Sequence, residues 1–312
     1  ADAPDWVQKK LAQMAAYRKR AEAIVATLEA ETIEGVSTAM HAAYARGGSA
    51  AVAELTGLSL PAEAGVFGTH ALEALVAETQ GALLATHTRI LRSTMDAYRS
   101  VIAETANEVL LGTQTRRQAA QAALNRFAEK GITGFVDKAG RGWSLETYTE
   151  MAMRTGTAHA AVQGQTDRLE ANGMDLVIIS DAPRECPLCR PHEGKVYSIS
   201  GTDPKYSSLD SAREGGLFHP GCRHSASLYQ PEVTRPSKRP TADPEGYEAG
   251  QKQRYLERQV RASKRMEAAA IDDVAKRQAQ VRIRAYQAKL REHVAANDLK
   301  RLSYREQIGK AH

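Results

Sequence analysis

The spacing of cysteine and histidine between residues 186 and 222 constrains this chain more than any other feature of its sequence. All three cysteines lie within 37 residues, in Cys186-Pro-Leu-Cys189 and in His219-Pro-Gly-Cys222. Two residues between ligands allow one tight turn to deliver both side chains to a single ion, and proline and glycine favour such turns. The pattern predicts one structural Zn²⁺, bound by Cys186, Cys189, His219 and Cys222, with no open position for a catalytic water.

Two other histidines are alternatives for the fourth ligand. His224 lies two residues after Cys222, and His192 lies close to the first cysteine pair. We favour His219 because its spacing from Cys222 mirrors that of the first pair. Three free thiols without a metal are the plainer alternative, and a thioredoxin-like redox pair is disfavoured because no βαβ pattern surrounds the cysteines. Three cysteines also argue against a disulfide framework.

Apolar residues at helical spacing predict long helices in the first part of the chain. Residues 5–57 carry an apolar side chain at every third or fourth position, and residues 69–111 show a second stripe of this kind. Gly47-Gly48 and the stretch from Gly57 to Pro61 are expected to mark the end of the first helix. Aromatic residues make up only 5% of the chain, which favours helices over a β sandwich or barrel.

The middle of the chain mixes helix and strand signals. Thr115 and Gln118 have the spacing of a capping box, which predicts a helix that stops near Gly131. Further elements are expected as a hairpin over 135–143, a helix over 144–170 that ends before Gly173, and strands at 175–180 and 194–200. Glu150 and Arg154 have the spacing of an exposed ion pair on the helix.

Four of the eleven prolines fall between residues 231 and 244. Because proline is not tolerated inside a helix, residues 230–246 are predicted to be an extended linker. Residues 247–310 then return to a helical pattern, with a break near Asp272-Asp273. The expected fold is therefore mainly α, with long helices at both ends and a small zinc-bearing α+β domain between them.

Positive charge is concentrated at the end of the chain. Residues 245–312 carry 16 Lys and Arg against nine Asp and Glu, or +7, whereas the remainder carries −2. Such a segment suits nucleic acid, an acidic protein surface or a solvated helix face. With few aromatic residues for base stacking, binding to double-stranded DNA is expected to involve phosphates and to lack sequence preference. The candidate contacts are Arg258, Arg261, Lys264 and Arg265.

The stretch from Gly131 to Tyr229 resembles the phage minor capsid proteins, a family related to the Mu-type head morphogenesis proteins. The resemblance lies in GITGFVDKAGRGWSLETYTEMAMRT (131–155), DLVIISDAPRECPLC (175–189), HEGKVYSISG (192–201) and FHPGCRH (218–224). Members often have a second metal-type residue just after the HPxCR core, and here that position is His224. The basic helical segment after a proline-rich linker is also similar.

This resemblance implies a low-copy virion protein that lies near the portal and helps the head to assemble. The implied location is the capsid interior or portal vertex, after assembly in the host cytoplasm. Partners would be the portal protein, the major capsid protein or sibling copies, and packaged DNA, with no membrane. We expect a helical assembly region (1–130), a zinc-binding α+β domain (131–229), a proline-rich linker (230–246) and a basic helical segment (247–312).

Signatures of enzymes are missing, so a catalytic role is not expected. The sequence has no phosphate loop, no G-x-S-x-G and no H-E-x-x-H. A zinc-bearing HNH-type nuclease, with His192 or His224 as base, is the first alternative, although the surrounding Asn and His pattern is missing. A nucleic-acid-binding protein of other origin is the second. The longest stretch without charged residues has 12 positions, too few for a membrane span of about 20, and the first residues lack the apolar core of a secretory signal.

Overall fold

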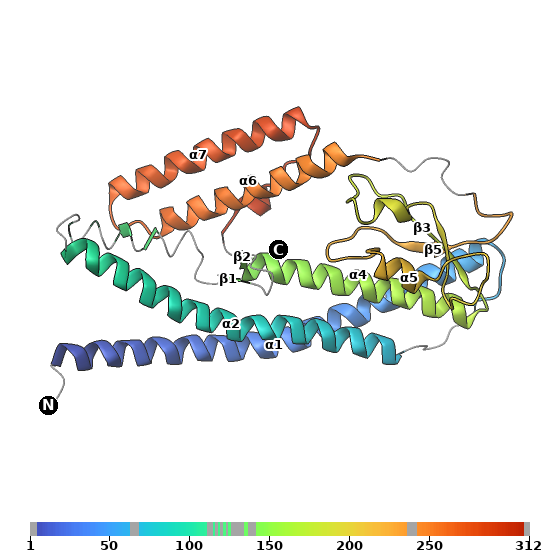
Figure 1. The fold of residues 1–312 in the computed structure, drawn as a ribbon, viewed down its shortest axis with the longest axis horizontal. Coiled ribbons are helices and arrows are strands. Elements are labelled where there is room, and N and C mark those ends of the chain that lie inside the picture. The colour runs from blue at the N-terminus through green and yellow to red at the C-terminus, as the bar shows by residue number, and fades with distance from the viewer. Residues whose placement is uncertain are drawn as a thin grey trace.

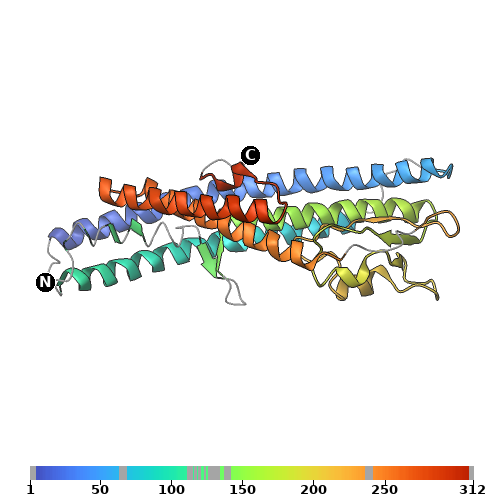
Figure 2. The ribbon, with the colours of Figure 1, turned by 90° about the horizontal axis from the view of Figure 1, so that it is seen from above.

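Three long helices run side by side along the molecule (Figures 1 and 2). The computed structural model describes residues 5–62, 69–110, 134–136, 142–235 and 242–308, together with positions 115, 118, 121, 122, 124 and 125. Helix α1 spans Asp5–Gly57, α2 spans Thr69–Leu110 and α4 spans Leu145–Ala171. Helix α2 returns antiparallel to α1, and α4 again follows the direction of α1. These bounds confirm the three helices predicted at 5–57, 69–111 and 144–170, and with them a mainly helical fold.

Gly47 and Gly48 lie inside α1, so the prediction that this pair helps to end the helix is wrong. Both glycines face α4. A Cβ atom on Gly47 would lie 2.8 Å from the carbonyl carbon of Ala161, and one on Gly164 would lie 2.8 Å from that of Tyr44. Because carbon atoms pack at about 3.5–4.0 Å, the two backbones approach more closely than any side chain would allow.

Among the described residues, α1, α2, α4 and the sheet enclose two apolar cores. The first lies between α1, α2 and α4 and includes Val36, Met40, Leu72, Val76 and Leu83. The second lies where the end of α1 meets the end of α4 and the sheet, and includes Leu55, Leu169, Val177, Ile179 and Leu228. The regions predicted as 1–130 and 131–229 therefore pack against one another through a shared core.

The sheet is small and antiparallel. Strand β3 (Leu176–Ile179) lies between β4 (Val196–Ser198) and β5 (Ala226–Leu228), with Val177 opposite Tyr197 and Leu228. A short helix, α5 (Leu209–Glu214), precedes β5. Both strands predicted at 175–180 and 194–200 are confirmed, each shorter than expected. The strand ends and the loops between them carry the cysteine and histidine pairs.

Two further predictions in the middle of the chain are confirmed. The backbone N–H of Thr115 donates to Oε1 of Gln118 at 3.0 Å, and the N–H of Gln118 donates to Oγ1 of Thr115 at 3.2 Å, which is a capping box. Strands β1 (Gly134–Val136) and β2 (Gly142–Ser144) pair antiparallel as the expected hairpin. The turn of that hairpin and the predicted helix end near Gly131 lie outside the described residues.

The basic end of the chain folds as a helical hairpin. Helix α6 spans Pro244–Ala268 and α7 spans Asp273–Ala296, and a short 3₁₀ helix, η2 (Ser303–Glu306), packs back on α6. The break expected near Asp272 is confirmed, since its side chain caps α7 by accepting from the N–H of Ala275 at 2.9 Å. Two boundaries are wrong. Pro244 begins α6 because proline is tolerated in the first turn, and the helix ends at Ala296 rather than near Lys310.

The hairpin buries more apolar surface than its charge suggested. Leu256 and Val260 on α6 and Ile283 and Leu290 on α7 are buried. By contrast, Val274 and Val281 remain more than half exposed. No helix among the described residues is long and apolar enough to cross a membrane.

Candidate metal centre

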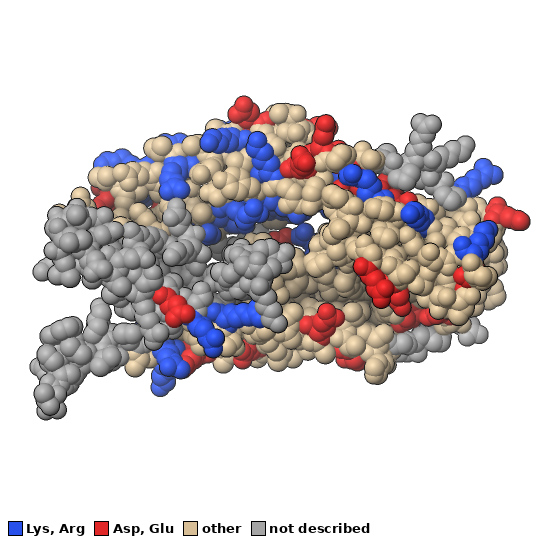
Figure 3. Space-filling view, viewed as in Figure 1, with Lys and Arg blue, Asp and Glu red and all other residues tan. Residues whose placement is uncertain are grey.

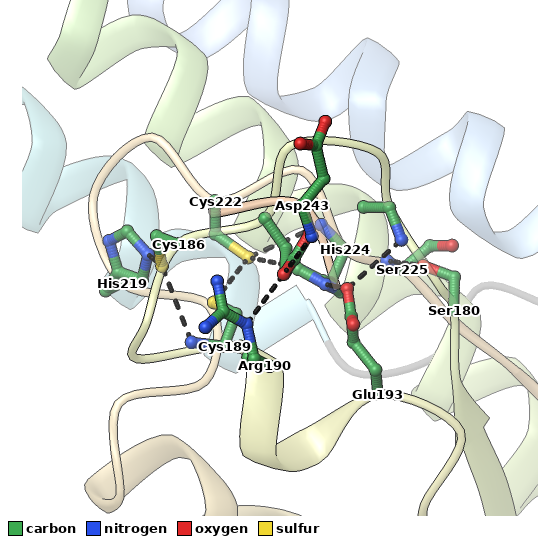
Figure 4. A network of polar contacts seen from close by, with 12 residues as sticks. Ser180, Cys186, Cys189, Arg190, Glu193, His219, Cys222, His224, Ser225 and Asp243 are labelled. Carbon is green, nitrogen blue, oxygen red and sulfur yellow. Dashed lines mark hydrogen bonds and ion pairs between the residues drawn. The ribbon is translucent and has the colours of Figure 1, made fainter. Parts of the chain in front are cut away.

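Two tight turns place the cysteine and histidine pairs beside each other (Figure 4). After β3 the chain turns at Cys186, whose carbonyl accepts from the N–H of Cys189 at 3.2 Å. The second turn is closed by the N–H of Cys222, which donates to the carbonyl of His219 at 2.9 Å. Gly221 adopts a φ of 83° in this turn, a conformation that favours glycine. Each two-residue spacing therefore forms the turn that it predicts.

Helix α4 fixes the second turn. His159 on α4 bonds through Nε2 to the carbonyl oxygen of Phe218 at 2.6 Å, and Oγ1 of Thr155 accepts from the N–H of Gly221 at 3.1 Å. Phe218 and Leu217 are buried in the core beside α4. The second pair is thus held by a long helix, while the first pair is held by the sheet.

The candidate ligand atoms form two groups that share Cys189. Cys186, Cys189 and His219 form one group, and Cys189, Cys222 and His224 form the other, with the ligand atoms of each group within 4.8 Å of one another. Sγ of Cys186 lies 2.7 Å from Nε2 of His219, and Sγ of Cys189 lies 3.4 Å from Sγ of Cys222. The structure therefore places three of the predicted ligands in one group, and the fourth, Cys222, in the other group with Cys189 and His224.

The three candidate histidines differ in what their ring nitrogens contact. Nδ1 of His219 bonds to the carbonyl oxygen of Pro220 at 3.0 Å, so Nε2 is left with a lone pair that faces Cys186. His224 is buried, and its Nε2 lies 2.6 Å from the Glu193 carboxylate while its Nδ1 lies 3.3 Å from Sγ of Cys222. His192 bonds to the hydroxyl of Tyr197 instead and is not part of either group.

The thiols share their protons unequally. The hydrogen bond with Cys189 lowers the pKa of Cys222 to about 4, and the contacts with His224 add to this effect. The same thiol pair raises the pKa of Cys189, because its proton is held between the two sulfurs. Burial lowers the pKa of His224, but its bonds to Cys222 and Glu193 outweigh burial and raise that pKa above its usual value. The pKa shifts therefore favour a thiolate at Cys222 and the protonated form of the neighbouring His224.

This donor set suits zinc. Three thiols and an imidazole are the soft and borderline ligands of closed tetrahedral zinc sites, and the low pKa of Cys222 provides one thiolate before any metal arrives. Oxygen ligands, which calcium and magnesium require, are not among the ligand atoms of either group. The residues present therefore fit a structural zinc ion better than a hard cation.

Two carboxylates near the cluster were missed in the sequence. Glu193 meets His224, and Glu185 bonds to Nε of Arg190 at 2.7 Å and accepts the backbone N–H of Asp243 at 3.0 Å. Both carboxylate side chains are fully buried. Their position within a few residues of predicted ligands was the available signal, since metal-site histidines often have a carboxylate as their outer partner.

All four candidate DNA contacts lie on α6, and two of them bond to the chain itself. Arg261 donates to the carbonyl oxygen of Arg305, Nζ of Lys264 donates to Oε1 of Gln307 at 2.7 Å, and Arg265 is half-buried. Arg258 is the exposed member of the set.

Comparisons with known proteins cover most of this chain. The family model described as phage minor capsid protein 2 matches residues 1–295. A protein named "Structural protein", from Lactococcus phage LL-H, is 29% identical over 217 residues, which cover 64% of this chain and 58% of that relative. The match thus spans less than two thirds of the relative's length. No solved structure matches.

Proposed function

Because the chain belongs to the phage minor capsid protein 2 family, we propose that it acts as a structural component of a tailed phage head. The named relative is itself a phage structural protein, which supports a place in the virion. Within the virion we propose the capsid interior or the portal vertex. Of the four regions expected from the sequence, we propose that 1–130 makes the assembly contacts, 131–229 binds the metal, 230–246 is a linker and 247–312 contacts DNA.

The observation that carries the metal-binding part of the proposal is the cluster of three cysteines and two histidines. We propose that Cys186, Cys189, Cys222 and His219 bind one Zn²⁺. Nε2 of His219 lies 2.7 Å from Sγ of Cys186, and Nδ1 of His224 lies 3.3 Å from Sγ of Cys222, so each ring presents one nitrogen to a thiol. We favour His219 because its spacing from Cys222 mirrors that of the cysteine pair. Zn²⁺ and three thiolates leave one net negative charge, which the imidazolium of His224 would offset. When bound, the metal would hold two loops together and contribute to folding.

Metal analysis tests this proposal directly. Protein purified without added metal is expected to contain about one zinc per chain by elemental analysis, with its three thiols protected from reaction until a chelator is added. Metal-free folded protein with freely reactive thiols would overturn it. A nuclease assay with and without Mg²⁺ tests the alternative of a nuclease. DNA cleavage that depends on the added metal would favour the nuclease over the structural role.

We propose that α1 and α2 provide the docking surface for the portal protein, the major capsid protein or sibling copies. Ile24 is 63% exposed and Ile33 is 47% exposed, and large apolar side chains at such exposure suit a partner surface. A pull-down of portal and capsid proteins by the full chain, compared with an Ile24→Lys and Ile33→Lys double variant, tests the proposal. Only the wild-type chain is expected to retain the portal or capsid protein. Equal retention by the double variant would show that the contact surface does not include Ile24 and Ile33.

The helical hairpin is proposed to contact packaged double-stranded DNA through its positive charge. Engaging about six phosphates would give a log–log salt slope of about −5, because each neutralised phosphate contributes about 0.9. Arg258, Arg261, Lys264 and Arg265 are the proposed contacts, although the internal bonds of Arg261 and Lys264 would have to be exchanged for phosphates. Reversing all four to Glu should weaken binding equally for every duplex sequence, whereas a flat salt dependence would instead favour an acidic protein surface.

A further inference from the structure

Helix α7 has a second face, opposite the one that packs on α6. The side chains of this face are uncharged, exposed and spaced alternately by four and three residues, and we name them the outer seam: Val274, Gln278, Val281, Ala285 and Ala288. Such spacing is that of a helix that packs lengthwise on another helix. The two valines are 56% and 58% exposed, and they line a hollow in the surface. Figure 1 shows α7 at the outer edge of the molecule, with α6 between it and the three long helices.

Positive charge borders the outer seam on both sides. Exposed cations follow one side at seven-residue spacing and the other side likewise: Arg277, Arg284 and Arg291, then Arg282 and Lys289. Residues 274–291 contain six Lys and Arg and no Asp or Glu, and Figure 3 shows Lys and Arg side chains along the outer edge of the hairpin. Pairing with a second α7 would place cations against cations, so the outer seam does not suit a copy of itself.

DNA does not account for this face. Phosphates need cations, but they gain nothing from two exposed valines in a row between the cations. The candidate DNA contacts proposed above also lie on α6 rather than on α7. A partner helix would cover both features, provided that its small or apolar side chains are bordered by Asp or Glu.

Helix α1 has this complementary pattern. Residues 21–35 contain four Glu and no Lys or Arg. Four exposed side chains there are spaced by three, four and three residues: Ala23, Ala26, Ala30 and Ile33. Glu22 and Glu34 are exposed on either side of them, and the ion pair of Glu22 with Arg18 is exposed and therefore weak. Because α1 and α7 lie at opposite edges of the molecule in Figure 1, the two patterns can meet only between copies.

We propose that the outer seam of α7 binds residues 21–35 of α1 in a second copy of this chain. The inference rests on the docking role proposed for α1 and names the sibling surface that meets it. Since the two surfaces differ, each copy has one of them left over when a pair forms. The contact is therefore repeated from copy to copy and produces a ring or a filament rather than a closed dimer.

Sedimentation velocity of the full chain over a range of concentrations tests the contact. Species larger than a dimer are expected in about 0.1 M salt, and they should dissociate in about 1 M salt, because the screening length falls from about 10 Å to about 3 Å. The double variant Val274→Ser and Val281→Ser should associate about tenfold more weakly, because the seam loses apolar area that the contact buries. Val233→Ser is the matched control, since Val233 is 55% exposed but lies outside α7, and it should associate like wild type.

Charge reversal tests the two partners separately. Changing the four arginines of the border (Arg277, Arg282, Arg284 and Arg291) to Glu takes residues 274–291 from +6 to −2. Changing the three exposed glutamates (Glu22, Glu31 and Glu34) to Lys takes residues 21–35 from −4 to +2. Each set alone places like charges opposite one another and should abolish association. Both sets in one chain should restore it in low salt, because the charges are again opposite.

A chain that stays monomeric in low salt at concentrations up to about 100 µM would overturn the proposal. So would equal association of wild type and the double valine variant, or a combined charge reversal that restores nothing. If the monomeric chain still retained portal or capsid protein in the pull-down described above, the docking role of α1 would stand and the sibling contact alone would fail. Loss of that retention on reversing the α7 charges would assign the outer seam to the retained protein instead.

Discussion

The crossing of α1 and α4 offers the sharpest test of the fold, through one methyl group placed at two positions of one helix. Gly47 faces the backbone of Ala161, whereas a Cβ on Gly35 would meet nothing within 4 Å. Both glycines lie in the helical interior of α1. Gly47→Ala and Gly35→Ala are therefore chemically the same change in opposite surroundings.

The two substitutions are expected to change the free energy of unfolding in opposite directions. In an exposed helix, replacing Gly by Ala stabilises by about 0.5–1 kcal/mol, which is the expectation for Gly35→Ala. At Gly47 the new methyl would overlap the carbonyl oxygen of Ala161 and lie 2.8 Å from its carbonyl carbon, so the helices must separate by at least about 1 Å to restore ordinary contact. Because neither backbone can rotate away, we take the upper end of overpacking costs, about 3 kcal/mol. The net destabilisation is about 2 kcal/mol, and the two variants differ by about 3 kcal/mol.

Urea unfolding followed by circular dichroism measures this difference as opposite shifts of the midpoint relative to wild type. Gly164→Ala, which adds the methyl from the α4 side next to Tyr44, should destabilise like Gly47→Ala. The double variant should cost less than the two single costs together, since one separation of the helices serves both. Equal shifts for Gly35→Ala and Gly47→Ala, or a Gly47→Ala protein as stable as wild type, would refute the close crossing.

Three further predictions concern the polar contacts. Burial opposes ionisation of Glu306, but bonds from Arg301 lower its pKa. The ionised carboxylate therefore stabilises the fold fully above its unfolded pKa, and this stabilisation is lost as pH falls through the lower folded pKa. Glu306→Gln should lower the free energy of unfolding by about 1–3 kcal/mol at pH 7, and acid titrations of stability should show a shallower fall for it between about pH 5 and 3 than for wild type. His219→Ala should abolish zinc binding measured by elemental analysis, whereas His224→Ala should keep the metal but bind it about 10–100-fold more weakly; the reverse result would exchange the two roles. Glu185→Ala should lower the free energy of unfolding by about 3–5 kcal/mol, because it leaves Arg190 unpaired. It should also speed amide hydrogen exchange in the first turn of α6. Unchanged exchange there would show that the Glu185 carboxylate does not anchor the hairpin.

Local patterns in the sequence predicted most of the elements. The helices predicted at 5–57, 69–111 and 144–170 match α1, α2 and α4 within a residue or so, and the capping box at Thr115 forms as its two side chains predict. Each two-residue spacing of the metal centre forms its turn because the turn is closed by a bond within itself. Such features depend on residues that are neighbours in the chain, and a sequence therefore shows them.

The remaining features depend on residues that are distant in the chain. The Gly47-Gly48 pair looks like a helix end in the local sequence. Its actual role, a close approach of α1 to α4, depends on the α4 backbone, which is distant in the chain. Pro244 suggests a linker from the sequence alone. In the structure Asp243 caps α6, and Pro244 lies in the first turn, where its missing N–H has no partner within the helix to lose. The role of Glu193 depends on His224, 31 residues away, and no spacing rule relates them.

The long separation between α1 and its partners has a consequence for synthesis of the chain. Tyr44 bonds to Asp167 across 123 positions, and Glu54 accepts the N–H of Leu228 across 174. At roughly 5–20 residues per second, translation delivers Leu228 about 10–35 s after Glu54. During that interval the face of α1 that includes the buried Leu55 has no sheet to cover it. Nascent chains stalled on neighbouring ribosomes would present this face to one another, so a host holding chaperone would be most needed before residue 228 emerges.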